Sequence, residues 1–167
     1  IRDRNGVTSF LPTTMTMSPK DIYGALNVIR ECMEQSLNGA KVLGAHMEGP
    51  FINRIYKGAQ PEQYVIKPSY EFIKDYTDVI RLVSYAPEMD EDYSFTKDVK
   101  EKTDITLSIG HTNATYDQAK EAFSLGCSHV THLFNAMTPL NHREPGVVGA
   151  SLTSDVFTEL IADTIHV

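Results

Sequence analysis

The sequence has few cysteines and no long apolar run, and each scarcity excludes a class of protein. Its 167 residues include only two cysteines, Cys32 and Cys127, which lie far apart and form no CxxC pair. A disulfide framework or a thiolate zinc knuckle is therefore not expected. The sequence shows no run of about 18 apolar residues and no leader with a cleavage site, so it predicts neither a membrane span nor a signal peptide. We expect a cytoplasmic protein.

Positive charge is also in short supply. Fifteen Lys and Arg residues face 22 Asp and Glu residues, which gives a formal charge of -7. This balance argues against binding to nucleic acid or to an anionic membrane surface. The sequence contains no P-loop, no GxGxxG motif and no serine nucleophile elbow, so nucleotide cofactors and serine hydrolase chemistry have no support. What the chain does have is 41% apolar residues, enough for the core of one globular domain.

Apolar, β-branched segments alternate with segments of helical periodicity. This alternation predicts a parallel α/β sheet, either doubly wound or closed as a (β/α)8 barrel. Ser18 and Pro19 supply a helix start, Gly39 is its expected end, and Thr115 with Gln118 predicts a capping box. The expected strands are 7–11, closed by Pro12, then 41–47, 79–85, 105–109, 129–133 and 160–167; the expected helices are 18–39, 69–76, 92–102 and 115–123. The stretch 49–68, rich in proline and glycine, is expected to be a functional loop.

Polar side chains follow four of the expected strands at the point where each strand ends. They are Glu48, His111, His132 and His166. A single His at such a place is usually structural, but in parallel α/β folds the carboxyl ends of the strands share one face, so the four residues are expected to gather. His46 lies on the same strand face as Glu48, where it either orients a metal ligand or simply packs. We interpret His129 as structural.

Glu48, His111 and His132 are the ligand types of a catalytic zinc or iron site with open positions for water. A bound metal can lower the pKa of water to about 7, so no side-chain nucleophile is needed. The other candidates are less specific. Asn135 and Ala136 could hold a substrate or form a plain turn, and Arg143 could bind an anion or pair with a nearby acid such as Glu144.

Six ordered motifs carry a resemblance to a known family. They are GAHMEGPFIN at 44–53, KGAQ at 57–60, IGHTNAT at 109–115, THLFNAM at 131–137, REPG at 143–146 and IADTIHV at 161–167. In these motifs the chain resembles the N-acetylglucosamine-6-phosphate deacetylases. That family consists of metal-dependent amidohydrolases on a (β/α)8 barrel, which convert N-acetyl-D-glucosamine 6-phosphate to D-glucosamine 6-phosphate and acetate.

The resemblance implies a role for each matching residue. Glu48, His111 and His132 would hold one or two divalent ions, with zinc as the first candidate and iron or cobalt as alternatives. His166 would polarise the acetyl carbonyl and stabilise the oxyanion. The residues implied to bind substrate are Ala59, Gln60, Asn135, Ala136 and Arg143 at the sugar phosphate, and Asp163, Thr164, Ile165 and His166 at the end of the chain.

The chain also departs from the family pattern. The family's general acid/base is an aspartate on the eighth strand, and its first strand carries a further polar motif; this chain contains neither. We therefore expect residues 1–167 to be a single catalytic barrel domain, incomplete at both ends, with about strands two to seven and almost no activity alone. Gln60 stands where some members have His. The resemblance also implies a homodimer of the full-length enzyme, in which Arg143 reaches the phosphate of the neighbouring subunit.

Two other functions stay open at this point. One is an amidohydrolase that acts on a cyclic amide or another acetylated sugar with the same metal chemistry. The other is a non-catalytic module that binds a metal or a sugar phosphate. Arg143 and the segment 58–60 favour the phosphosugar enzyme, through resemblance alone.

Overall fold

The computed structural model describes residues 6–35 and 39–166. Its main sheet has six parallel strands whose spatial order follows the chain: β2 (Thr13–Thr14), β4 (Ala45–Glu48), β5 (Ile80–Tyr85), β6 (Thr106–Ile109), β7 (His129–Val130) and β8 (Phe157–Thr158). A second parallel pair consists of β1 (Ser9–Phe10) and β3 (Lys41–Val42). Across the described residues, no helix is both long enough and apolar enough to cross a membrane.

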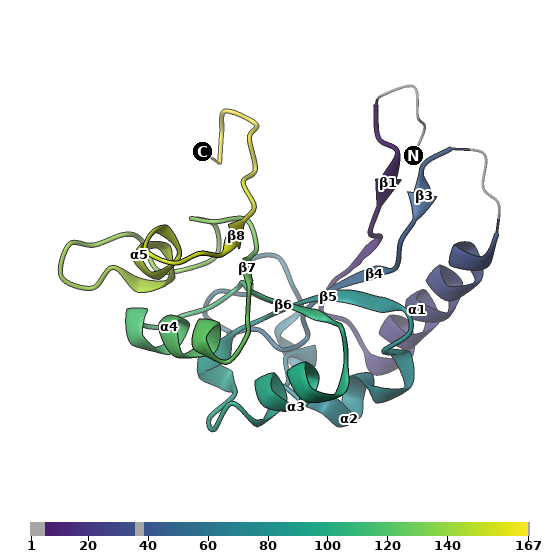
Figure 1. The fold of residues 1–167 in the computed structure, drawn as a ribbon, viewed down its shortest axis with the longest axis horizontal. Coiled ribbons are helices and arrows are strands. Elements are labelled where there is room, and N and C mark those ends of the chain that lie inside the picture. The colour runs from purple at the N-terminus through teal and green to yellow at the C-terminus, as the bar shows by residue number, and fades with distance from the viewer. Residues whose placement is uncertain (1–5, 36–38, 167) are drawn as a thin grey trace.

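Helices connect the strands. They are α1 (Pro19–Glu34), α2 (Tyr70–Ile73), α3 (Ser94–Lys102), α4 (Tyr116–Ser124) and α5 (Gly146–Leu152), with short 3-10 turns η2 (Glu62–Tyr64), η3 (Lys74–Tyr76) and η4 (Pro87–Met89). Figure 1 shows α1, α2, α3 and α4 along one side of the curved sheet. A parallel sheet in chain order with helices on its outer side is a partial (β/α)8 barrel, so the predicted fold class is confirmed.

The core lies between this sheet and its helices. Tyr85 at the end of β5 is fully buried and packs edge-on against Phe95 of α3. Because side chains alternate along a strand, Ser84 faces the opposite, inner side of the sheet. The same alternation on β4 buries Met47 in the core and turns His46 and Glu48 inward. The strands thus carry an apolar face for the helices and a polar face for the site.

The predicted helix starts are confirmed. Ser18 caps α1 by accepting from the Asp21 amide, and Thr115 with Gln118 forms the predicted capping box at α4. The expected end of the first helix at Gly39 is wrong, since α1 ends at Glu34. Residues 36–38 lie outside the described residues.

The first two predicted strands differ from the structure in different ways. β1 ends before Pro12, as predicted, but a separate strand that was not predicted, β2, follows Pro12 and joins the main sheet. The second predicted strand breaks at Gly44, between β3 and β4. A Cβ atom on Gly44 would lie 2.4 Å from Arg81 Cγ and 2.6 Å from the Val79 carbonyl oxygen, so the break needs glycine.

The predicted strand over 160–167 is wrong. The sixth strand of the sheet is β8. The amides of Phe157 and of Glu159, which follows β8, donate to the carbonyls of Ser128 and Val130. Residues 160–166 have no strand partner and are mostly exposed, so their apolar composition alone does not make a strand; Val167 lies outside the described residues. Helix α5 was not predicted, because its glycines and valines have low helix propensity, and its almost complete burial overrides that preference.

Candidate active site

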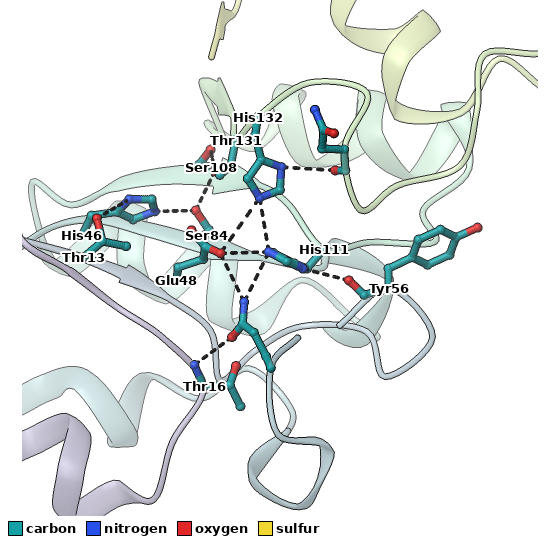
Figure 2. A network of polar contacts seen from close by, with 12 residues as sticks. Thr13, Thr16, His46, Glu48, Tyr56, Ser84, Ser108, His111, Thr131 and His132 are labelled. Atoms are coloured by element: carbon teal, nitrogen blue, oxygen red, sulfur yellow. Dashed lines mark hydrogen bonds and ion pairs between the residues drawn. The ribbon is translucent and has the colours of Figure 1, made fainter. Parts of the chain in front are cut away.

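Glu48, His111 and His132 converge at the carboxyl ends of β4, β6 and β7. His111 Nε2 lies 2.9 Å from Glu48 Oε1 and 3.2 Å from His132 Nε2, and His132 Nε2 lies 4.0 Å from the same carboxylate oxygen. One ligand atom from each residue lies within 4.8 Å of the other two, a spacing that could hold a metal ion. Figure 2 shows the three side chains pointing toward one another from separate strands.

Backbone strain accompanies two of these ligand candidates. His111 has a φ of 49° and His132 a φ of 32°, both in the region that L-residues rarely adopt. Such conformations cost of order 1–3 kcal/mol each and persist only where the surroundings enforce them. Both imidazoles of the cluster have this conformation, which indicates that the surrounding structure fixes the direction of the two rings.

Main-chain carbonyls determine the tautomer of both rings. His111 Nδ1 lies 2.8 Å from the Tyr56 carbonyl oxygen, and His132 Nδ1 lies 3.1 Å from that of Asn135. A carbonyl oxygen can only accept, so each Nδ1 carries a proton, and in the neutral form of each ring the Nε2 lone pair faces the cluster. Two facing lone pairs beside a carboxylate repel one another unless a cation lies among them. The donor set therefore fits a divalent metal.

Electrostatics favour an ionised Glu48. Burial alone would raise the pKa of this carboxyl, but a protonated His111 ring, which donates to the carboxylate, and the charges of protonated His132 and His46 lower its pKa below the usual value. An ionised carboxylate with a low proton affinity is the form that binds a metal.

Gln60 lies against this cluster rather than on the open surface. Its Oε1 accepts from the Thr16 amide at 2.7 Å, which turns its Nε2 toward Glu48 Oε1 and His111 Nε2, each 3.2 Å away. The side chain is buried. The segment expected to be a functional loop thus brings both Gln60 and the Tyr56 carbonyl to the cluster.

A layer of buried hydroxyls lies beneath the cluster. His46 Nε2 is 2.6 Å from Ser84 Oγ, which is 2.6 Å from Thr131 Oγ1, which in turn is 2.7 Å from Ser108 Oγ. The chain of contacts links β4, β5 and β6 to Thr131, the residue before His132 (Figure 2). Burial lowers the pKa of His46, which favours its neutral form. His46 therefore supports the strands that carry the cluster, without belonging to it.

The residues expected at the sugar phosphate lie in several places. Asn135 and Ala136 are half-buried just after His132, and Ala59 is exposed beside Gln60. Arg143 is exposed and lines a hollow of about 510 Å³ with Asn113, Tyr116 and Glu144. Their roles toward a substrate stay predictions.

His166 is not brought to the cluster in the described part of the chain. Its Nδ1 lies 2.6 Å from Asp163 Oδ2, and its amide donates to Asp163 Oδ1 at 2.8 Å. Hydrogen bonds from the His166 amide, the Ile165 amide and the His166 ring lower the pKa of Asp163 to about 2. Thr164 between them has a φ of 66°, and Thr164 and Ile165 are exposed. The structure leaves the catalytic role of this segment as a prediction.

Sequence reasoning missed four contributors. Tyr56 acts through its main-chain carbonyl, which no side-chain pattern reveals. Ser84 and Thr131 are small hydroxyls inside strands, where their placement next to His46 depends on register. Glu88, which accepts from Asn53, Thr112 and Asn113, follows β5, and its position after a strand was the one available signal.

Comparison with known proteins supports the resemblance. No protein-family model matches the chain. The N-acetylglucosamine-6-phosphate deacetylase of Bacillus subtilis is 43% identical over 169 residues, which cover 96% of this chain and 42% of that protein. The N-acetylgalactosamine-6-phosphate deacetylase of Escherichia coli O157:H7 is 37% identical over 98% of this chain and 45% of that protein.

A solved structure agrees. The N-acetylglucosamine-6-phosphate deacetylase of Thermotoga maritima superposes with a TM-score of 0.88 at 34% identity, over 97% of this chain and 44% of that one. The chain thus spans less than half the length of the relatives that it matches. Over the segment that it spans, the chain is a relative of the N-acetylglucosamine-6-phosphate deacetylases in both sequence and fold.

Proposed function

We propose that the protein containing this chain is a metal-dependent deacetylase of N-acetyl-D-glucosamine 6-phosphate, which yields D-glucosamine 6-phosphate and acetate. The observation that carries the proposal is the cluster of Glu48, His111 and His132, with both rings held in the metal-binding tautomer. The named relatives support the substrate. N-acetyl-D-galactosamine 6-phosphate is the second candidate, because one relative carries that name.

A divalent ion held by the cluster would supply Lewis acidity toward an amide carbonyl and a water molecule. Zinc is the first candidate, with iron and cobalt as alternatives, since a carboxylate and two imidazoles suit all three. One or two ions are compatible with the proposal.

The chain's own residues would bind and orient the substrate. Arg143 offers a guanidinium for the phosphate, and Gln60, Ala59, Asn135 and Ala136 surround the sugar. The Asp163 carboxylate engages His166 Nδ1, which leaves the other ring nitrogen, Nε2, free for the acetyl oxygen. We extend the proposal to a homodimer in which Arg143 acts on the phosphate of the neighbouring subunit.

The decisive experiment is metal analysis and acetate release on the complete gene product that contains these residues. We expect one or two metal ions per chain and hydrolysis of N-acetyl-D-glucosamine 6-phosphate. A panel with the galactosamine epimer, an acetylated sugar without phosphate and a cyclic amide separates the substrate classes. Metal binding with hydrolysis of the cyclic amide alone would remove the sugar from the proposal, and metal binding without any turnover would favour a non-catalytic module.

A further inference from the structure

Glu88 connects three segments of chain that surround His111. It lies in η4, directly after β5. Its Oε1 accepts from Asn53 Nδ2 at 3.0 Å and from the Asn113 amide at 2.6 Å, and its Oε2 accepts from Thr112 Oγ1 at 2.6 Å. One carboxylate thus joins the loop after β4, the turn after β5 and the loop after β6.

Those segments are the ones that orient the His111 ring. Thr112 and Asn113 follow His111 directly, so Glu88 holds the backbone on the carboxyl side of the strained residue. Asn53 donates its main-chain amide to the His111 carbonyl at 2.8 Å and lies in the loop whose Tyr56 carbonyl holds His111 Nδ1. The backbone of His111 is therefore flanked by residues that Glu88 holds directly, and the ring is held by a loop that Glu88 contacts through Asn53.

A carboxylate is well suited to hold several segments of chain together. Hydrogen bonds to an ionised carboxylate are roughly twice as strong as those between neutral groups. Glu88 is half-buried, and no Lys, Arg or His forms an ion pair with it among residues 6–35 and 39–166. Its negative charge is thus balanced by donors from the loops alone. Asn53, Thr112 and Asn113 belong to the sequence motifs, yet the proposed chemistry gives them no task.

We propose that Glu88 is a positioning residue that fixes the direction of His111, and thereby the metal affinity of the cluster. The inference rests on the proposed function, because it requires His111 to be a metal ligand. Groups that orient a ligand from behind typically change metal affinity by about 10–100-fold when they are removed.

The test uses the complete gene product stripped of metal and titrated with Co²⁺ against a competing chelator. We expect Glu88→Ala to weaken Co²⁺ binding by about 10–100-fold and to change the visible absorption of the bound ion. With Co²⁺ at saturation, the loss should fall on kcat rather than on KM, since Glu88 does not touch substrate. Glu91→Ala is the matched control: Glu91 lies three residues away, is exposed and pairs with Lys67, and its loss should leave affinity and spectrum unchanged.

A second variant keeps the test decisive if Glu88→Ala does not fold. Glu88→Gln retains an oxygen for Asn53 and Asn113, and we expect it to fold and to weaken Co²⁺ binding in the same direction by a smaller factor. Unchanged affinity and spectrum in a folded Glu88→Ala or Glu88→Gln protein would overturn the positioning role. If the unmodified protein binds no Co²⁺, the metal centre itself is wrong, which is a different and separable failure.

Discussion

Each imidazole of the cluster owes its chemistry to one carbonyl oxygen. The Tyr56 and Asn135 carbonyls place the protons of His111 and His132 on Nδ1, so the inner nitrogens meet as acceptors. Without those carbonyls, a proton on one Nε2 would let the two rings form an ordinary hydrogen bond. The cluster is therefore held open for a cation by groups outside it.

This arrangement makes His132 far more sensitive to substitution than His129, which lies three residues earlier on β7. His132→Asn should lower metal affinity of the complete gene product by at least about tenfold and reduce deacetylation in parallel, since it removes one of three ligands. His129→Asn is the matched control, because the His129 ring stacks on Phe157 at 5.0 Å, away from the cluster. Equal metal content in the two variants by elemental analysis would remove His132 from the ligand set.

The two cysteines should differ in reactivity. Burial raises the pKa of the Cys127 thiol to about 12, and the residue is almost inaccessible, whereas Cys32 on α1 is half-buried. Because the thiolate is the reactive form, Cys127 should resist iodoacetamide at pH 8 in the folded protein and react once guanidinium unfolds it. Peptide mass spectrometry of the labelled protein reports each site separately. Labelling of the Cys127 peptide at the rate of an exposed thiol would contradict its burial.

At the scale of single residues, the sequence predicts the candidate metal ligands better than the residues that orient them. Glu48, His111 and His132 could be found because each follows an apolar strand, and strand ends share one face of a parallel sheet. Glu88 and Tyr56 could not, since their contribution depends on how loops fold back, and loop geometry has no simple period. Gln60 lies between these cases. The family resemblance identifies it as a site residue, but only the structure shows its contact with Glu48.

Among the elements, α1 is attached to the rest of the fold by packing and by a polar anchor at Arg30. Ile22 and Leu26 bury its inner face, and Arg30 reaches the chain before β5. The Arg30 guanidinium donates to both carboxylate oxygens of Asp78, at 2.8 and 2.6 Å, and to the Asp75 carbonyl at 2.9 Å. Bidentate geometry gives this surface pair more order than a single contact would.

The anchor should show a defined pH dependence. The hydrogen bond from Arg30 lowers the pKa of Asp78 below its usual 3.8, so the pair stabilises the fold above that pH and loses its effect as the pH falls through the folded-state value. Asp78→Asn should reduce the free energy of unfolding by roughly 0.2–1 kcal/mol at pH 7, in keeping with partly exposed pairs. Urea unfolding at pH 7 and pH 3 measures the difference.

Two further measurements complete that test. At pH 3 the difference between the original protein and Asp78→Asn should shrink, and molar salt at pH 7 should reduce it as well. Lys74→Gln serves as a control, since Lys74 and Glu71 form an exposed pair between residues only three positions apart. A difference of the same size at pH 3 and pH 7 would show that Asp78 does not act through its charge.

Element types follow the sequence where a local signal exists. The capping box at Thr115 and the helix start at Pro19 could be predicted from the sequence, because the residues that form the motif are also the ones that make the contacts at the start of the helix. The last strand and α5 were not. Phe157 and Thr158 pair with β7 although the apolar run lies further along, and Val147 is helical because the core encloses it. Tertiary contacts decide both cases.

For the whole molecule, the main consequence of the fold is that the sheet has two edges. β2 and β8 each have one strand neighbour, on opposite ends of the six-stranded order. Near β8, Phe157 is 72% exposed and Ile165 is 86% exposed, and beside β2 an apolar hollow of about 520 Å³ is lined by Met15, Met17 and residues of α1. Unpaired strand edges with exposed apolar side chains promote association.

We therefore expect the isolated 167-residue chain to self-associate and to bind a hydrophobic dye, and to release almost no acetate from N-acetyl-D-glucosamine 6-phosphate. Sedimentation velocity across a concentration series measures the association. The double variant Met15→Lys with Phe157→Lys should reduce it, because a charge beside each edge opposes pairing, whereas Ile55→Lys, at an even more exposed apolar site in the loop after β4, should not. A single sedimenting species at monomer mass that melts cooperatively would instead mean that the six strands suffice for a stable fold. Deacetylation by that monomer at the rate of the complete gene product would mean that the described residues hold all the chemistry.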